Sequence, residues 1–201
     1  MLGPNYAFKP IAEQALCSNQ NIVPQRLNAA LDLMATIPEL RQLIEESPSW
    51  RRVLSGIVGG LTEVGLSQDE GHLLIVSHSG RGLYDLLQRL RVARDGSVPA
   101  LSSPWISEAN RLVRGIGPRA DEWFECVGLW GGALASSLGP DVSVEVRGEG
   151  DVEVALLRDG SCVWEITRAI TEMRVFGFSR SGSLLVFAAS GEFSVFERFE
   201  S

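Results

Sequence analysis

The chain contains 201 residues, 45% of them hydrophobic, which is enough for one domain with a core and too few for two comfortable domains. Its 25 acidic residues outnumber its 18 basic residues and give a formal net charge of −7 at pH 7. A protein of this charge repels a phosphate backbone and anionic lipid. We therefore expect neither nucleic acid nor a membrane surface as a partner, whereas a basic protein partner stays open.

The sequence shows no segment typical of secretion or membrane insertion. No basic stretch leads into an apolar run at the N-terminus, and the apolar runs stop well short of the ~18 residues that a spanning helix needs. The cysteines, Cys17, Cys126 and Cys162, are far apart and lack a CxxC spacing, which favours neither a disulfide framework nor a zinc site. These features predict a cytoplasmic protein without a metal or other cofactor.

Residues 1–33 are expected to form a loosely ordered leader, because they show no sustained helical or alternating hydrophobic period. Two blocks in this leader are more specific: residues 5–10, Asn-Tyr-Ala-Phe-Lys-Pro, and residues 24–31, Pro-Gln-Arg-Leu-Asn-Ala-Ala-Leu. They resemble the translated ends of the imperfect inverted-repeat recombination site that flanks gene cassettes in bacterial chromosomal integrons. The resemblance implies a mobile accessory gene whose natural start could be Met34. Residues 34–201 are expected to form a single β-rich globular domain.

A short amphipathic helix is predicted over residues 37–46. Thr36 and Glu39 have the spacing of a capping box, in which the two side chains satisfy the first free amides of a helix. Three apolar residues would then share one face of this helix, namely Leu40, Leu43 and Ile44. Pro48 would end the element.

The rest of the chain is predicted to consist mainly of strands joined by glycine turns. Residues 71–80 and 182–191 can be aligned, since each holds a four-residue apolar run between glycines and leads to a second strand-like piece. A third hairpin is predicted for residues 152–166, in which an Asp-Gly pair is a strong turn signal. Residues 142–146 alternate between valine and polar residues, which is typical of a strand with one buried face.

Two segments leave the choice between helix and strand open. Residues 82–92 keep leucines at helical spacing but follow a predicted strand, so they suit either element. Residues 107–113 suit a second short helix that Ser107 could cap.

The predicted fold class is α+β, with mainly antiparallel β-hairpins, an N-terminal capped helix and a loosely ordered leader. Propeller-like blades are open locally, but at about 40 residues per blade the chain has room for no more than four.

The turn at residues 77–82 is the strongest candidate for a ligand site. A nucleophile elbow is disfavoured there, because Arg81 is not the small residue that the elbow needs and no histidine lies far downstream to serve as a base. The turn is similar to the phosphosugar-binding turn of sugar isomerase domains, in which a Ser-x-Ser-Gly motif offers hydroxyls and amides to a phosphate. The resemblance implies an anionic, phosphosugar-like ligand held by Ser77, Ser79 and Gly80, with Arg81 beside them. A serine-rich hairpin turn without a ligand is the plain alternative.

An acidic and aromatic patch is the candidate partner-binding surface. Asp121 and Glu122 directly precede Trp123, and Trp130 lies among glycines, where a large ring could be offered at a loop tip. Solvation of a loop or helix would explain the acidic residues without a partner. The two histidines of the chain have no cysteine or carboxylate at ligand spacing, so no metal site is predicted.

Several short blocks resemble one family of uncharacterised bacterial β-rich proteins. In chain order they are residues 79–82, 91–95, 115–118, 127–132 and 176–182, and the ordered resemblance spans residues 72–199. It implies a compact β-rich domain and favours a strand over residues 82–95. It carries no assigned activity.

The leading functional hypothesis is a non-enzymatic protein-binding module, of the immunity or antitoxin type, that covers a basic surface of a toxin. Acidic charge would steer association with such a partner, no catalytic set is recognised, and the cassette resemblance implies an accessory role. The alternative is a small-molecule-binding protein that holds an anionic ligand at residues 77–82. A homo-oligomer with no other partner is a third hypothesis.

Overall fold

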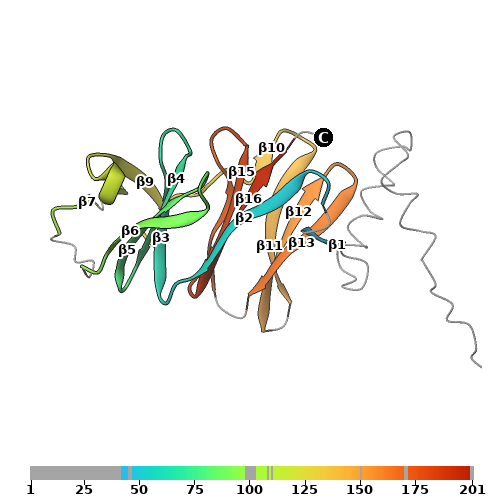
Figure 1. The fold of residues 1–201 in the computed structure, drawn as a ribbon. Coiled ribbons are helices and arrows are strands. Elements are labelled where there is room, and N and C mark those ends of the chain that lie inside the picture. Colours follow the sequence, from blue (N-terminus) through green and yellow to red (C-terminus); the bar gives the residue numbers. More distant parts are fainter. Residues whose placement is uncertain are drawn as a thin grey trace, which may run out of the picture.

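The computed structural model describes residues 42–44, 47–97, 103–107, 109, 111–149, 151–169 and 172–199. In this part of the chain three β-sheets are stacked side by side, and a four-stranded sheet lies between a seven-stranded and a five-stranded one (Figure 1). Nearly all strand pairs are antiparallel. The fold is therefore a layered β structure.

The middle sheet combines strands from both ends of the described chain. In order, its strands are β14 (Met173–Phe178), β15 (Leu184–Ala189), β16 (Glu192–Arg198) and β2 (Trp50–Ile57). The C-terminal hairpin β15–β16 thus pairs with a strand from the N-terminal part. All six residues of β15 are buried, as expected for a strand that has a sheet on each of its two faces.

The seven-stranded sheet curls into a half-barrel. In order, its strands are β6 (Leu90–Asp95), β5 (Gly80–Asp85), β4 (His72–Ser77), β3 (Leu61–Leu66), β9 (Trp123–Gly128), β8 (Leu112–Arg114) and β7 (Ile106–Ser107). Buried side chains of β4 and β5 pack against those of β8 and β9, so the two ends of the sheet face each other. A 3-10 helix, η4 (Gly117–Arg119), lies against β6.

The five-stranded sheet completes the stack. In order, its strands are β1 (Gln42–Leu43), β13 (Cys162–Ala169), β12 (Val152–Asp159), β11 (Val142–Glu149) and β10 (Ser137–Leu138). The short strand β1 pairs in parallel with β13. At the β12–β13 turn Gly160 has a φ of 60°, a conformation that glycine adopts at no steric cost.

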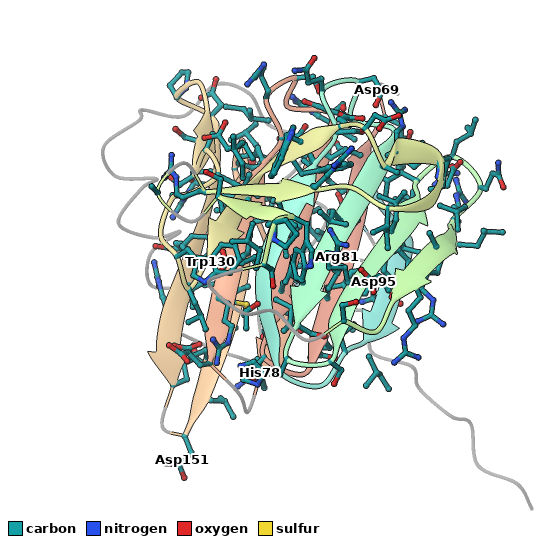
Figure 2. All side chains as sticks on the ribbon, turned by 90° about the vertical axis from the view of Figure 1, so that its left-hand side faces the viewer. Asp69, His78, Arg81, Asp95, Trp130 and Asp151 are labelled. Atoms are coloured by element: carbon teal, nitrogen blue, oxygen red, sulfur yellow. The ribbon has the colours of Figure 1, made fainter. Side chains whose placement is uncertain are left out.

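Arg81 bridges the two ends of the half-barrel, and Figure 2 shows its side chain beside Asp95. It is only 7% exposed. Its Nη2 donates to Asp95 Oδ2 and its Nη1 donates to the carbonyl oxygen of Arg114, each at 2.5 Å. Its guanidinium carbon lies 3.9 Å from the centre of the Trp105 ring. Charge-assisted hydrogen bonds and a cation–π contact therefore tie β5 to β6, to β8 and to the segment before β7.

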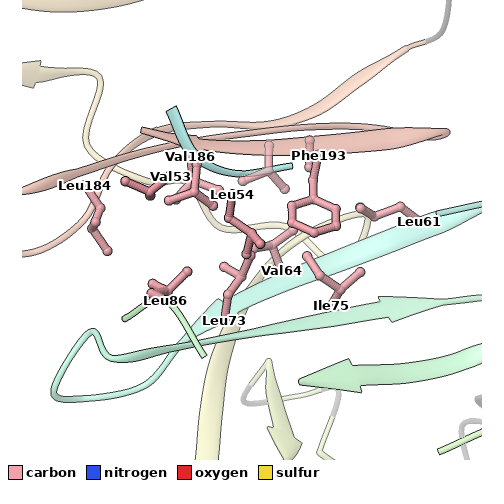
Figure 3. Close-up of a cluster of buried hydrophobic side chains, with 13 residues drawn as sticks. Val53, Leu54, Leu61, Val64, Leu73, Ile75, Leu86, Leu184, Val186 and Phe193 are labelled. Carbon is pink, nitrogen blue, oxygen red and sulfur yellow. The ribbon is translucent and has the colours of Figure 1, made fainter. Parts of the chain in front are cut away.

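Apolar side chains fill both interfaces of the stack. Between the half-barrel and the middle sheet, branched side chains from β2, β3, β4 and β15 surround the ring of Phe193 (Figure 3). Between the middle and five-stranded sheets, the core includes Trp50, Phe178 and Phe187. Each fully buried side chain of this size contributes roughly 1.5–3 kcal/mol relative to an exposed one, so the two cores fix the order of the three sheets.

The predicted strands and hairpins are confirmed. The two apolar runs that align in the sequence are β4 and β15, and each forms a hairpin with the strand that follows it. The predicted hairpin at residues 152–166 is the β12–β13 pair, and residues 142–146 lie in β11. Residues 82–92 belong to β5, a turn and β6, so the strand interpretation is correct and the helical one is wrong.

The predicted α+β class is wrong, because the described residues form sheets and contain no α-helix. Gln42–Leu43, within the predicted capped helix, form strand β1 instead. Leu43 is 54% exposed, whereas Ile44 is fully buried in the core between the middle and five-stranded sheets. In the predicted helix both side chains would share one apolar face, whereas Leu43 ends strand β1 with its side chain exposed and only the next residue, Ile44, enters the core.

The second predicted helix, at residues 107–113, is also replaced by strands. Ser107 belongs to β7 and Leu112 begins β8, and these two residues are paired. Val113 is buried inside the half-barrel, next to the partly exposed Leu112, which is strand periodicity. The predicted leader, residues 1–33, lies outside the described residues.

The two described cysteines differ in state. Cys126 is a free, buried thiol inside the half-barrel. Cys162 is disulfide-bonded, a bond that the spacing of the cysteines did not indicate.

Candidate anion-binding site

A small cavity of about 220 Å³ lies between the β4–β5 hairpin, strand β6 and the connection from β2 to β3. Its wall includes Arg91 and Arg94 from β6, Tyr84 from β5, Ser79 from the hairpin turn, and residues 57–59. We call it the arginine pocket. It is smaller than the ~300–1,000 Å³ of pockets for drug-sized ligands, so its volume suits one compact group of a ligand.

The arginine pocket is cationic because two of its three arginines have no carboxylate partner among the described residues. Arg91 and Arg94 are exposed, and neither forms an ion pair with another described residue. Among the described residues that line the pocket there is no aspartate or glutamate. Of the other arginines, Arg81 lines the pocket but pairs with Asp95. Seven more pair with carboxylates outside the pocket, namely Arg51, Arg111, Arg114, Arg119, Arg147, Arg168 and Arg174. The pocket is thus a positively charged site on a protein whose net charge is negative.

The predicted turn residues line this pocket, but their polar groups are largely engaged within the turn. Ser77 Oγ donates to the carbonyl oxygen of Gly80 at 3.2 Å and accepts a hydrogen bond from the amide of Ser79 at 3.2 Å. The amide of His78 donates to the carbonyl oxygen of Gly60. Since these two amides are occupied, an anion would depend on the arginines for its charge-assisted contacts.

Arg81, the fourth predicted ligand residue, also lines the pocket, yet its guanidinium serves the half-barrel through Asp95, the Arg114 carbonyl and the Trp105 ring. The hydrogen bond from Arg81 and the contact with Ser97 lower the pKa of Asp95 to about 2. The pair is therefore fully charged near neutral pH, and Arg81 is committed to Asp95.

Arg91 and Arg94 are candidate site residues that the sequence analysis did not single out. They lie in the block of residues 91–95, which carries part of the resemblance to the bacterial family but was given no chemistry. Two arginines three residues apart would face different sides of a regular strand. The β5–β6 pairing is not regular, because its register shifts between Leu83 and Tyr84. With this irregularity in β6, both arginines line the same cavity.

Gly80 holds the turn against β6 and provides a test of this packing. It has a φ of 112°, and a Cβ added to it would lie 2.0 Å from the carbonyl oxygen of Asp95. We expect Gly80→Ala to lower the free energy of unfolding by about 1–3 kcal/mol in guanidinium denaturation, because strain and overlap both oppose the methyl group. Gly96→Ala is the matched control, since its added Cβ would meet no atom within 4 Å. Equal stability of the two variants would contradict the packing.

The acidic and aromatic patch is divided by the structure. Asp121 and Glu122 precede β9, and Trp123 begins it, with an exposed side chain. Trp130 follows the other end of β9 and packs partly buried against the core of the half-barrel. The first three residues therefore lie together, and Trp130 lies apart from them.

The charge of this patch is largely neutralised. Arg114 pairs with Asp121 at 3.2 Å, and Arg119 pairs with Glu122 at 3.2 Å. Glu122 also accepts a hydrogen bond from the amide of Gln68 at 3.1 Å. Because arginines balance these carboxylates, the patch attracts a basic partner less than its sequence implies.

Trp130 belongs to a tight turn that is held by a buried carboxylate. The amide of Trp130 donates to Glu63 Oε1 at 2.9 Å. Glu63 is fully buried, and its Oε2 has no hydrogen-bond partner in the described structure. Burial raises the pKa of Glu63 to about 7, against the lowering effect of the Trp130 and Leu129 amides. Glu63 thus holds the Trp130 turn through its carboxylate.

A larger cavity of about 710 Å³ lies where the three sheets meet. Its lining mixes apolar residues such as Trp123, Leu134 and Phe178 with polar ones such as Gln68, Glu125 and Arg180. The carboxylate of Glu70 at its rim accepts hydrogen bonds from the hydroxyls of Ser179 and Ser181. The wall of this cavity holds both acidic and basic side chains, whereas the arginine pocket presents positive charge alone.

Other site chemistry is limited within the ranges that the structure describes. No group of three or more His, Cys, Asp or Glu side chains there is placed to hold a metal ion. Nor does that part of the chain contain a helix with the length and apolar character to cross a bilayer. Comparisons of the chain with models of protein families and with curated proteins found no match.

Proposed function

We propose that this protein is a binding protein that holds a compact anionic group of its ligand, a phosphate or a carboxylate, in the arginine pocket. The observation that carries the proposal is the pair of exposed, unpaired guanidinium groups of Arg91 and Arg94 around one cavity. Guanidinium groups form paired, charge-assisted hydrogen bonds with carboxylate and phosphate oxygens. Tyr84 and Ser79 add hydroxyl groups to the same wall.

The geometry supports binding more than nucleophilic catalysis. Ser77 Oγ donates to a carbonyl oxygen, so its proton is not directed to a base. A role in covering a basic toxin receives less support, because Arg114 and Arg119 neutralise the acidic patch that would face it. The arginine pocket instead suits an acidic ligand.

The proposal predicts that inorganic phosphate stabilises the protein more than chloride at equal ionic strength and neutral pH. A ligand at ten times its dissociation constant adds about 1.4 kcal/mol to the free energy of unfolding. For a chain of this length that raises the melting temperature by about 3–6 °C. The measurement is thermal unfolding followed by circular dichroism across a phosphate series.

Matched variants assign the effect to the pocket. Arg91→Ala combined with Arg94→Ala should abolish the phosphate-dependent rise, because both guanidinium groups are removed. Arg147→Ala should retain it, since Arg147 lies on β11 in the five-stranded sheet and pairs with Glu145. A rise that persists in the double variant, or no rise in the original protein, would overturn the proposal.

A further inference from the structure

Strand β6 is an edge strand. It stands last in the order of the seven-stranded sheet and, among described strands, it pairs with β5 alone. The outward N–H and C=O groups of such a strand can pair with an added strand, which is a common mode of peptide recognition. The edge is therefore a surface onto which an extended segment can dock.

The unpaired arginines continue along this edge beyond the arginine pocket. Arg89 directly precedes β6, is exposed, and forms no ion pair with another described residue. It lines a separate cavity of about 770 Å³, whose wall also holds Arg51, Arg180 and the carboxylates of Asp69, Glu70 and Glu197. At about 3.3 Å per residue, the row from Arg89 to Arg94 spans about 16 Å. One small anion in the pocket cannot reach both ends of this row.

Exposed apolar side chains lie next to the arginine row. Leu87 is 89% exposed, and Leu90 at the start of β6 is also largely exposed. Such side chains offer apolar contacts to a polypeptide and nothing to a free inorganic anion. The surface thus combines a strand edge, a row of positive charge and apolar contacts.

We infer that the anionic group belongs to an acidic, extended segment of a partner protein, which adds to the sheet along β6 and sets carboxylates beside Arg89, Arg91 and Arg94. The inference rests on the proposed function, because the arginine pocket would hold one of these carboxylates. A second copy of this chain is a poor occupant, since pairing β6 with β6 would bring like charges together. Nucleic acid is disfavoured by the net charge of −7.

The test is the binding of a fluorescein-labelled peptide with alternating threonine and glutamate, followed by fluorescence anisotropy on the full chain. Two control peptides separate charge from strand pairing. One has glutamine in place of every glutamate, and the other keeps the glutamates but carries N-methyl groups on alternate amides. We expect the glutamate peptide to bind at least about tenfold more tightly than either control, because opposite charges and main-chain pairing both contribute.

Variants of the protein locate the peptide. Arg89→Ala, Arg91→Ala and Arg94→Ala should each weaken the glutamate peptide severalfold, and Arg147→Ala should not. Equal binding of the N-methylated peptide would overturn strand addition. If phosphate stabilises the protein but the glutamate peptide does not bind, the inference fails and the proposed function stands. If neither binds, both fail.

Discussion

Replacing Arg81 with methionine is expected to lower the free energy of unfolding by about 3 kcal/mol. The substitution leaves the Asp95 carboxylate and the Arg114 carbonyl oxygen without their donor, and it removes the cation from the Trp105 ring. Asp95 is 27% exposed and can recover some hydration, which keeps the loss below that of a fully buried pair. In thermal unfolding, the melting temperature should fall by about 6–12 °C.

A double-mutant cycle assigns this loss to the ion pair. Asp95→Asn should cost less in the Arg81→Met background than in the original protein, with a coupling energy of about 1–2 kcal/mol. Arg147→Met is the control for removal of an exposed arginine, and we expect it to cost less than about 0.5 kcal/mol. If Arg81→Met costs no more than this control, Arg81 does not hold the half-barrel together.

Replacing Glu63 with glutamine is expected to stabilise the protein above pH 7. Burial raises the pKa of Glu63 to about 7 from an ordinary value of 4.5, so between these values the folded protein binds a proton that the unfolded chain does not. The stability of the original protein therefore falls as pH rises from about 4.5 to about 7 and stays level above that. Glutamine can still accept the hydrogen bond of the Trp130 amide while it carries no charge. We expect a gain of about 2–3 kcal/mol at pH 8.

Chemical denaturation at several pH values between 5 and 8 measures this effect. The difference between Glu63→Gln and the original protein should grow with pH across this interval. Glu192→Gln makes the same chemical change at an exposed residue of β16 and serves as the control. Parallel stability curves for Glu63→Gln and the original protein would show that the buried carboxylate is not destabilising when ionised.

The hairpins could be predicted because their signals are local. The runs that became β4 and β15 are apolar along their length and bounded by glycine turns, and nearly all of their residues are buried. The Asp159 and Gly160 pair marks the β12–β13 turn, where Gly160 has the positive φ that such a turn requires. A short apolar run between two strong turn signals is too short for a helix, so the hairpin is the structure that the local sequence favours.

The N-terminal helix could not be excluded from local sequence. Thr36 and Glu39 provide a capping signal, but the partner of β1 is β13, which follows more than 100 residues later: Gln42 pairs with Trp164 and Leu43 with Glu165. Ile44 gains a fully buried position in the core beside β13. Tertiary packing of this kind routinely overrides helix propensity, and one sequence does not reveal the pairing.

The sequence pointed to the turn at residues 77–82 but not to the arginines beside it. Ser77, Ser79 and Gly80 line the arginine pocket, so the turn at residues 77–82 overlaps in position with the site proposed here. The sequence did not show that Ser77 is engaged within the turn or that Arg81 is bound to Asp95. Which arginines lack a carboxylate partner depends on contacts between distant residues, and Arg91 and Arg94 are set apart because both also line one cavity.

The central claim is that Arg91 and Arg94 together hold an anionic group. The most direct measurement is a phosphate titration followed by ¹H–¹⁵N spectra of the arginine Nε–H groups, with signals assigned through Arg91→Lys and Arg94→Lys. The account predicts that the signals of Arg91 and Arg94 shift together and saturate with one dissociation constant, while that of Arg147 stays in place. Uniform small shifts of all exposed arginines without saturation would contradict it.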